Sequence, residues 1–351
     1  MNFSNLSDIN YDLSEKFYIR IGSTWVIDSI YIFIIAPMGF IGFMLNFVTL
    51  IVMSKIKIKQ TKLYDYLILY SLNSCLICFI IGFLFLSYSP RYFNQYVFTS
   101  DIVKFYRCRV FIYGVMCLYF FGNILDLFIS MDRISIFIKR LDSFRKMKPY
   151  ILCFCICLGC FIVNSPLVIT YELMTNQDYF TKNVTSYCTP NELGKTKYGL
   201  ALNLLVILIR DILTLTFEII SSYFIIYHYK IYSIVKNVNA TVAAADQIDA
   251  NNLQKRESMA TNRKKWTKGK KLMLMTVYLS ITSFATHVIV ATVFVLLVNL
   301  LLEKYPLVYF SLVCFGAFIL NFKHFLNIFI FFAFNSNFRK QLKYYFKFNK
   351  K

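Results

Sequence analysis

Residues 149 to 171 read "PYILCFCICLGCFIVNSPLVITY", a stretch of 23 residues that contains no Asp, Glu, Lys or Arg. A helix of about 20 apolar residues is long enough to cross the hydrocarbon layer of a bilayer, which is roughly 30 Å thick. Across the whole chain 58% of the residues are hydrophobic and only 16% are charged, below the level that is typical of soluble domains. The stretch predicts a transmembrane helix, and the composition predicts a membrane protein.

Six further segments of the chain are long and apolar enough for the same role. Three of them, 29–54, 66–90 and 272–302, are also free of charged residues, and the other three contain isolated charges. Backbone amides in lipid must be hydrogen-bonded within their own segment, so each segment is predicted to be a helix. The predicted helices form an all-α bundle of seven and cover residues 29–53, 65–88, 108–132, 149–171, 200–227, 272–300 and 306–333.

The net charge of +20 would also suit a nucleic-acid-binding protein, so the position of the basic residues decides between the two classes. Of the 38 lysines and arginines, 26 lie in every second connection of the predicted bundle, at 54–63, 133–149, 228–271 and 334–351. Cytoplasmic loops of membrane proteins carry such an excess. The pattern places the amino terminus outside the cell and the carboxyl terminus in the cytoplasm, and nucleic acid is not an expected partner.

The connections have distinct predicted roles. Residues 1–28 form an extracellular amino terminus, and residues 334–351 form a cytoplasmic amphipathic helix and tail. Residues 229–271 form a long third cytoplasmic loop. Its basic end either anchors the chain at the inner leaflet or also meets a cytoplasmic partner. Sequons for glycosylation lie on the predicted outer side at Asn2, Asn5 and Asn183.

Cysteines occur in two settings. Four of the ten lie in the fourth predicted helix, at Cys153, Cys155, Cys157 and Cys160. Free cysteines are commonly small buried hydrophobic residues, and no His or carboxylate joins this group, so we expect no metal site. No cofactor is expected either. Cys108 and Cys188 both lie on the predicted outer side, which is oxidising, and a bridge between them would hold the second outer loop over the bundle.

A set of spaced residues extends over the whole chain. Cys108 lies 25 residues before Arg133 in "LFISMDRISIF", where Asp132 stands next to the arginine. In the seventh predicted helix "NIFIF" begins at Asn327, the amphipathic stretch "NFRKQLKYYFKF" follows it, and Asn46 lies in the first predicted helix. These motifs and their separations resemble those of the rhodopsin-like (class A) G-protein-coupled receptors.

The resemblance implies seven transmembrane helices, a short amphipathic eighth helix, and a disulfide between Cys108 and Cys188. It also implies an activation switch at the cytoplasmic side, in which an aspartate restrains the neighbouring arginine until that arginine meets a G protein. The residues of this switch are Asp132, Arg133, Asn327 and Phe331.

The chain also departs from the family pattern. The second predicted helix lacks the family's aspartate, and Asn73 is the nearest polar residue. In the seventh, Ile328 and Phe331 replace the family's proline and tyrosine. These departures point to a divergent, invertebrate-like branch.

Charged side chains within a membrane are functional candidates, because they are costly to bury. Lys323 and His324 lie one helical turn before Asn327, at positions where the family contributes ligands to an internal sodium ion. We hypothesise that the Lys323 ammonium replaces this ion and pairs with Asp126 of the third predicted helix. The alternative is a polar contact of Lys323 with backbone or water.

Other polar residues within the predicted bundle have less defined roles. Arg210 and Asp211 interrupt the fifth predicted helix. Neighbouring residues on a helix point about 100° apart, so the two are not expected to face one neighbour. They either bind a polar ligand or bond to adjacent helices. His287 in the sixth is interpreted as a polar residue whose hydrogen bonds are satisfied, and a place in a pocket lining is the alternative.

The sequence limits the ligand as well. Amine receptors of the family carry an aspartate where this chain has Val115, 18 residues before Arg133, so a monoamine is not expected. Lys323 lies too close to Asn327 to match the chromophore lysine of an opsin. Peptides, lipids and other small molecules are left, and a peptide is favoured.

These observations favour a G-protein-coupled receptor of the plasma membrane that binds an extracellular ligand and activates a heterotrimeric G protein. A multi-pass transporter or channel, with an ion path along the buried charges, is the competing interpretation. An enzyme is not expected, because the sequence contains neither paired catalytic aspartates nor a His-Glu-x-x-His motif.

Overall fold

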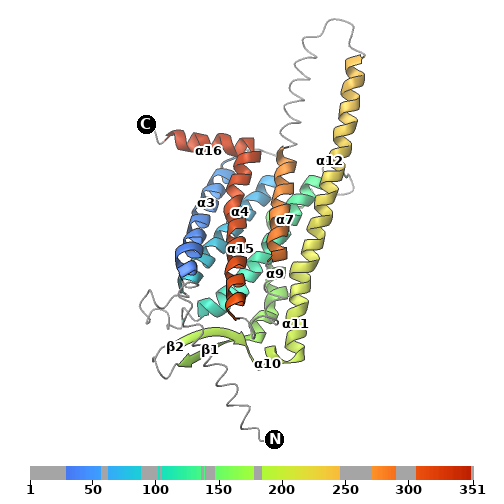
Figure 1. Ribbon diagram of the computed structural model, residues 1–351. Helices are drawn as coiled ribbons and strands as arrows, with labels where there is room; N and C mark the ends of the chain where they lie inside the picture. Colours follow the sequence, from blue (N-terminus) through green and yellow to red (C-terminus); the bar gives the residue numbers. More distant parts are fainter. Residues whose placement is uncertain are drawn as a thin grey trace.

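Seven helical stretches of the described chain lie side by side in the computed structural model, with a β-hairpin at one end and helix α16 across the other (Figure 1). The structure describes residues 29–56, 62–87, 102, 105–135, 138, 147–177, 184–245, 271–289 and 306–348. Several stretches combine an α-helix with a π-helical segment, labelled η.

The stretches follow the apolar segments of the sequence, and the expected seven-helix bundle is confirmed. In chain order they are η1 (Tyr31–Ile35) with α3 (Ala36–Ser54); α4 (Lys62–Ser87); η2 (Tyr106–Val115) with α7 (Met116–Ile134); α9 (Pro149–Thr170); α11 (Lys197–Ile207) with η4 (Leu208–Leu213) and α12 (Thr214–Ala245); the helix Lys271–Ile289; and α15 (Pro306–Phe334).

Helix α12 extends further than the sequence suggested. The fifth helix was expected to end at residue 227 and a loop to cover 229–271, but α12 continues to Ala245. Its final residues include neither Gly nor Pro and end in three consecutive alanines, the best helix formers, so nothing stops the helix earlier. Residues 246–270 of the expected loop, and residues 290–300 of the sixth predicted helix, lie outside the described part.

The loop after α9 contains a β-hairpin that the sequence analysis did not anticipate. Strands β1 (Tyr171–Gln177) and β2 (Val184–Pro190) pair antiparallel, with Tyr171 opposite Pro190 and Gln177 opposite Val184. Threonine and tyrosine recur in both strands and favour extended backbone. Both strands contact η2, so the hairpin lies against the end of the third helical stretch.

The bundle places apolar side chains outside and many polar side chains inside. On α9, Phe154, Leu158 and Ile162 follow one face and are 65%, 50% and 71% exposed. Such a large exposed apolar surface is unfavourable in water and costs nothing in lipid. Polar residues of several helices are buried instead, and they form the site described below.

Two glycines allow the first two helical stretches to pack closely. A Cβ atom added to Gly39 of α3 would lie 2.8 Å from the Cα of Gly82 in α4. Small residues permit this approach of two backbones, which is a common means of packing helices in membranes.

Helix α16 (Ser336–Phe348) leaves the bundle at a sharp angle. It is inclined by 101° to the end of α15, so it crosses the bundle end (Figure 1). Phe338 of α16 is fully buried, and its ring lies 6.2 Å from that of Phe331 in α15. This contact fixes the amphipathic eighth helix against the bundle.

Candidate functional site

A lysine and an aspartate from distant parts of the chain meet inside the bundle. Nζ of Lys323 on α15 lies 3.3 Å from Oδ2 of Asp126 on α7, and both side chains are almost completely buried. Water does not reach these buried groups, so loss of one partner would leave the other as an uncompensated charge. The structure brings together the two residues that the sequence suggested as an intramembrane pair.

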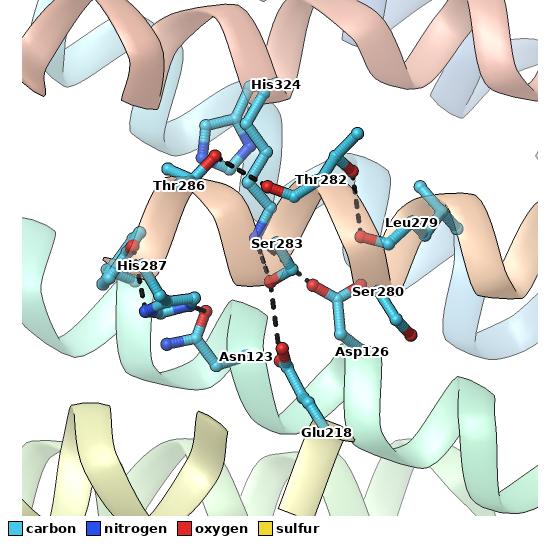
Figure 2. Close-up of polar contacts among 12 residues, drawn as sticks. Asn123, Asp126, Glu218, Leu279, Ser280, Thr282, Ser283, Thr286, His287 and His324 are labelled. Carbon is cyan, nitrogen blue, oxygen red and sulfur yellow. Dashed lines mark hydrogen bonds and ion pairs between the residues drawn. The ribbon is translucent and has the colours of Figure 1, made fainter. Parts of the chain in front are cut away.

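A serine and a glutamate extend this pair to two further helices. Nζ of Lys323 donates a hydrogen bond of 2.8 Å to Oγ of Ser283 on the helix Lys271–Ile289. The same Oγ lies 3.5 Å from Oε1 of Glu218 on α12. In Figure 2 the carboxyl groups of Asp126 and Glu218 approach Ser283 from two directions. Four helices therefore share one cluster, which we call the charged cluster: Asp126, Glu218, Ser283 and Lys323.

His287 lies one turn from Ser283 and has both ring nitrogens engaged. Its Nε2 is 2.7 Å from Oδ1 of Asn123, and its Nδ1 is 3.2 Å from the hydroxyl of Tyr119. An amide oxygen only accepts, so Nε2 carries a proton, and Nδ1 can accept the tyrosine proton. The contacts match a neutral ring with satisfied hydrogen bonds. Lys323 lies 6.0 Å from the centre of the Tyr119 ring, which joins this histidine to the charged cluster.

A second polar group connects α3, α4 and α15. Nδ2 of Asn46 donates to the backbone oxygen of His324 at 3.0 Å. Nδ1 of His324 lies 3.1 Å from Oγ of Ser74, and Nδ2 of Asn327 donates to the same oxygen at 3.3 Å. Two of the polar residues suggested by the sequence, His324 and Asn327, thus meet at Ser74, and Asn46 joins them through the backbone of His324.

Asn73 does not join this group. Its Nδ2 donates to the backbone oxygen of Leu118 on α7 at 3.0 Å. The space for this contact comes from Gly122, where an added Cβ would lie 2.8 Å from the same nitrogen. Asn73 therefore connects α4 to α7 and lies apart from Ser74 and its partners.

Arg210 and Asp211 bond to each other, an arrangement that the sequence did not suggest. Nε and Nη2 of Arg210 donate to the two carboxylate oxygens of Asp211 at 3.0 and 2.7 Å. Both residues lie in the π-helical segment η4, and the long arginine side chain can turn back to its neighbour. Planar guanidinium and carboxylate groups match in this two-bond geometry. The two charges neutralise each other within one segment.

Asp132 and Arg133 form an ion pair at the last turn of α7. Nη2 of Arg133 donates to Oδ2 of Asp132 at 2.8 Å, and both residues are buried. The end of α7 that carries this pair is on the same side of the bundle as α16 (Figure 1). A guanidinium carries five N–H donors in a planar fork.

Comparison with solved structures identifies the arrangement of the helices. The crystal structure of squid rhodopsin matches with a TM-score of 0.60 and covers 92% of this chain and 86% of that chain. The chain has the seven-helix fold of rhodopsin. Sequence identity over the match is 16%, so the likeness concerns the fold. No protein-family model and no curated protein matches the sequence.

Within this rhodopsin fold, an asparagine that the sequence analysis missed joins the seventh helix to α16. Oδ1 of Asn335 accepts from the backbone nitrogens of Asn337 and Phe338, both at 3.1 Å. It also accepts from the hydroxyl of Tyr64 on α4 at 3.3 Å. Asparagine is a preferred residue before the first turn of a helix, and this preference was the available signal.

Some predicted site residues cannot be assessed structurally. The side chains of Cys108 and Cys188 lie outside the described part, although the backbone segments that carry them, η2 and β2, are in contact. Asn2, Asn5 and Asn183 also lie outside the described residues. The disulfide and the glycosylation sites stay predictions.

Proposed function

We propose that the chain is a G-protein-coupled receptor of the plasma membrane, which binds an extracellular ligand and activates a heterotrimeric G protein. The observation that carries the proposal is the buried ion pair of Asp132 and Arg133 at the last turn of α7, in a chain with the fold of rhodopsin. An ion pair at the end of a helix is by itself common. Its position in this fold, with an amphipathic helix at the same end, supports a receptor.

The pair would act as a restraint on the resting state. Asp132 holds the guanidinium of Arg133 through a charge-assisted bond. When the inner ends of the helices separate, Arg133 would leave Asp132 and meet the G protein. A ligand drives this change only if it binds the open state more tightly than the resting state.

The buried polar contacts would carry the change through the bundle. The charged cluster involves α7, α12, α15 and the helix Lys271–Ile289, so displacement of any one of them alters its ionic contacts. Packed groups with two discrete arrangements can couple distant sites in this way.

For the ligand we favour a peptide. Val115 on η2 is buried and apolar, and it offers no anion for a protonated amine. Arg210 and Asp211 already neutralise each other, which gives no isolated charge in η4 to fix a small ion. The hairpin β1–β2 lies against η2 and would present backbone groups to an extended chain.

Nucleotide exchange tests the proposal directly. The full-length chain in lipid nanodiscs would be incubated with purified G proteins and screened against a peptide library. A peptide that accelerates exchange several-fold on wild type, and not on Arg133→Ala, would support the receptor. Ion flux through proteoliposomes without any ligand, together with no exchange, would instead favour a transporter or channel.

A further inference from the structure

Glu218 is the acid of the charged cluster to which the proposed receptor mechanism assigns no charge state. It lies on α12 and is only 2% exposed. Its Oε1 has one contact, the 3.5 Å approach to Ser283, and its Oε2 has no hydrogen-bond partner among the described residues. A hydroxyl bond to a carboxylate is normally well under 3.0 Å. The surroundings of Glu218 are therefore poor for a negative charge.

The charges near Glu218 do not balance if every group is ionised. The ionisable groups that act on it are Asp126 from α7 and Lys323 from α15. Two carboxylates and one ammonium would leave a net negative charge inside the bundle, which is very unfavourable in a low-dielectric region.

The remaining polar neighbours do not correct the imbalance. His287 is held as a neutral ring by Asn123 and Tyr119. Tyr119 and Tyr70 also lie near the cluster, and a phenol is neutral at physiological pH. Arg210 is paired with its own neighbour in η4. One additional positive charge is needed to make the cluster neutral. A proton bound to one of the two carboxylates would supply it.

The contacts indicate which acid holds that proton. Asp126 has the ammonium at 3.3 Å and lies within hydrogen-bonding reach of Ser283. Ser283 accepts from Lys323, so its single hydrogen can go to only one acid. A neutral Glu218 can supply its own proton to Ser283, which leaves the serine hydrogen for Asp126. In this arrangement Lys323 and Glu218 each donate one proton to the Ser283 oxygen, and Ser283 donates its own to Asp126.

We propose that Glu218 is a proton-binding site inside the bundle and that, once deprotonated, it is the second counter-ion of Lys323. Transfer of the proton from Glu218 through the Ser283 hydroxyl to Asp126 would exchange the two carboxylates, with no change in total charge. The ammonium then pairs with α12 instead of α7. Provided that the proposed function is correct, this exchange links the protonation state of the cluster to the movement of α12.

Infrared spectroscopy of the purified full chain tests the bound proton without any signalling assay. Wild type at neutral pH is expected to show the carbonyl stretch of one buried carboxylic acid. The band should shift when glutamate is labelled with carbon-13 and should vanish in Glu218→Gln. A band that shifts with labelled aspartate, or that persists in Glu218→Gln, would overturn the assignment, and so would a spectrum with no such band.

Two further variants test the second role. In Asp126→Asn the labelled-glutamate band should disappear, because Glu218 ionises to hold Lys323. Glu218→Gln should then leave the thermal unfolding temperature almost unchanged in wild type and lower it clearly in Asp126→Asn. Equal effects of Glu218→Gln in both backgrounds would refute the second role. Glu192→Gln, at an exposed position of helix α10 (Glu192–Lys195), is the matched control and should leave the band of the buried acid unchanged.

Discussion

The ammonium of Lys323 lies 3.3 Å from the carboxylate of Asp126, in the interior of a seven-helix bundle. The two residues belong to the seventh and third helical stretches, so the contact joins helices that are distant in sequence. A charge pair enclosed in this way makes each residue dependent on the other.

Replacement of Lys323 by Met should destabilise the folded chain by roughly 3 kcal/mol or more, because the carboxylate of Asp126 would be left buried without its cation. The loss would appear as reduced surface expression and a lower unfolding temperature. The reversed pair, Asp126→Lys with Lys323→Asp, should recover much of what each single reversal loses. No recovery in the double variant would show that the pair does not stabilise the bundle.

Substitution of Asp132 by Asn should raise ligand-independent nucleotide exchange, because Arg133 loses the carboxylate that holds it at 2.8 Å. Arg133→Ala should abolish exchange even with a ligand. Asp132→Glu keeps the charge and is the control, with basal exchange near wild type. At equal surface expression, an unchanged basal rate in Asp132→Asn would count against the restraint.

A methyl group at Gly39 should destabilise the packing of α3 on α4. The added Cβ would approach the Gly82 backbone to 2.8 Å, and a backbone cannot move aside as a flexible side chain can. Overpacking of this kind costs roughly 1–3 kcal/mol. Gly159→Ala on α9 is a matched control, since its Cβ meets nothing within 4 Å. Thermal unfolding in one detergent would compare the two, and equal unfolding temperatures would contradict the close approach.

Asn335→Ala should weaken the junction of α15 and α16 by about 1 kcal/mol, because two backbone amides lose their acceptor. Faster amide hydrogen exchange in the first turn of α16 would reveal the effect. Asn335→Ser keeps an acceptor oxygen and should exchange more slowly than the alanine variant. Identical exchange in all three proteins would exclude a capping role.

The predicted disulfide can be examined by a double substitution. If Cys108 and Cys188 are bridged, each single change to Ser should reduce surface expression as much as the double change does. Cys155→Ser, on the exposed face of α9, is the control and should express normally. Two free thiols at these positions in the wild-type protein, detected by alkylation and mass measurement, would rule the bridge out.

The bundle was predictable from the sequence because backbone groups in lipid must be hydrogen-bonded within their own helix. The long apolar segments of the sequence show where these helices lie. The hairpin and the extension of α12 were harder to foresee, since they lie in the polar connections. In these connections water can bond to backbone groups as well as a helix can. The helix or strand propensity of the residues therefore decides whether regular structure forms. Three alanines and the lack of a helix breaker proved stronger than the polar composition of the α12 extension.

The site was only partly predictable. Asp126 and Lys323 stood out because charges are rare in membrane helices and a buried charge needs an opposite charge. Glu218 carried the same signal, but its place beside Ser283 depends on helix rotation, which one sequence does not define. The bond between Arg210 and Asp211 was not considered at the level of sequence, because it depends on the flexible arginine side chain turning back to its neighbour. Asn335 had a local signal as a residue before a helix, but its bond to Tyr64 becomes possible only after folding.

The charge-free helix α9 has a consequence for how this protein can change over generations. Among its 22 residues only Pro149, Cys153, Cys160, Asn164 and Thr170 are buried. The exposed side chains Phe154, Leu158 and Ile162 face hydrocarbon, which accepts any apolar shape. Apolar replacements at these exposed positions should therefore have little effect on folding, because only hydrophobicity is required there. The stretch that most clearly predicts a membrane protein thus contains positions that should tolerate many apolar substitutions.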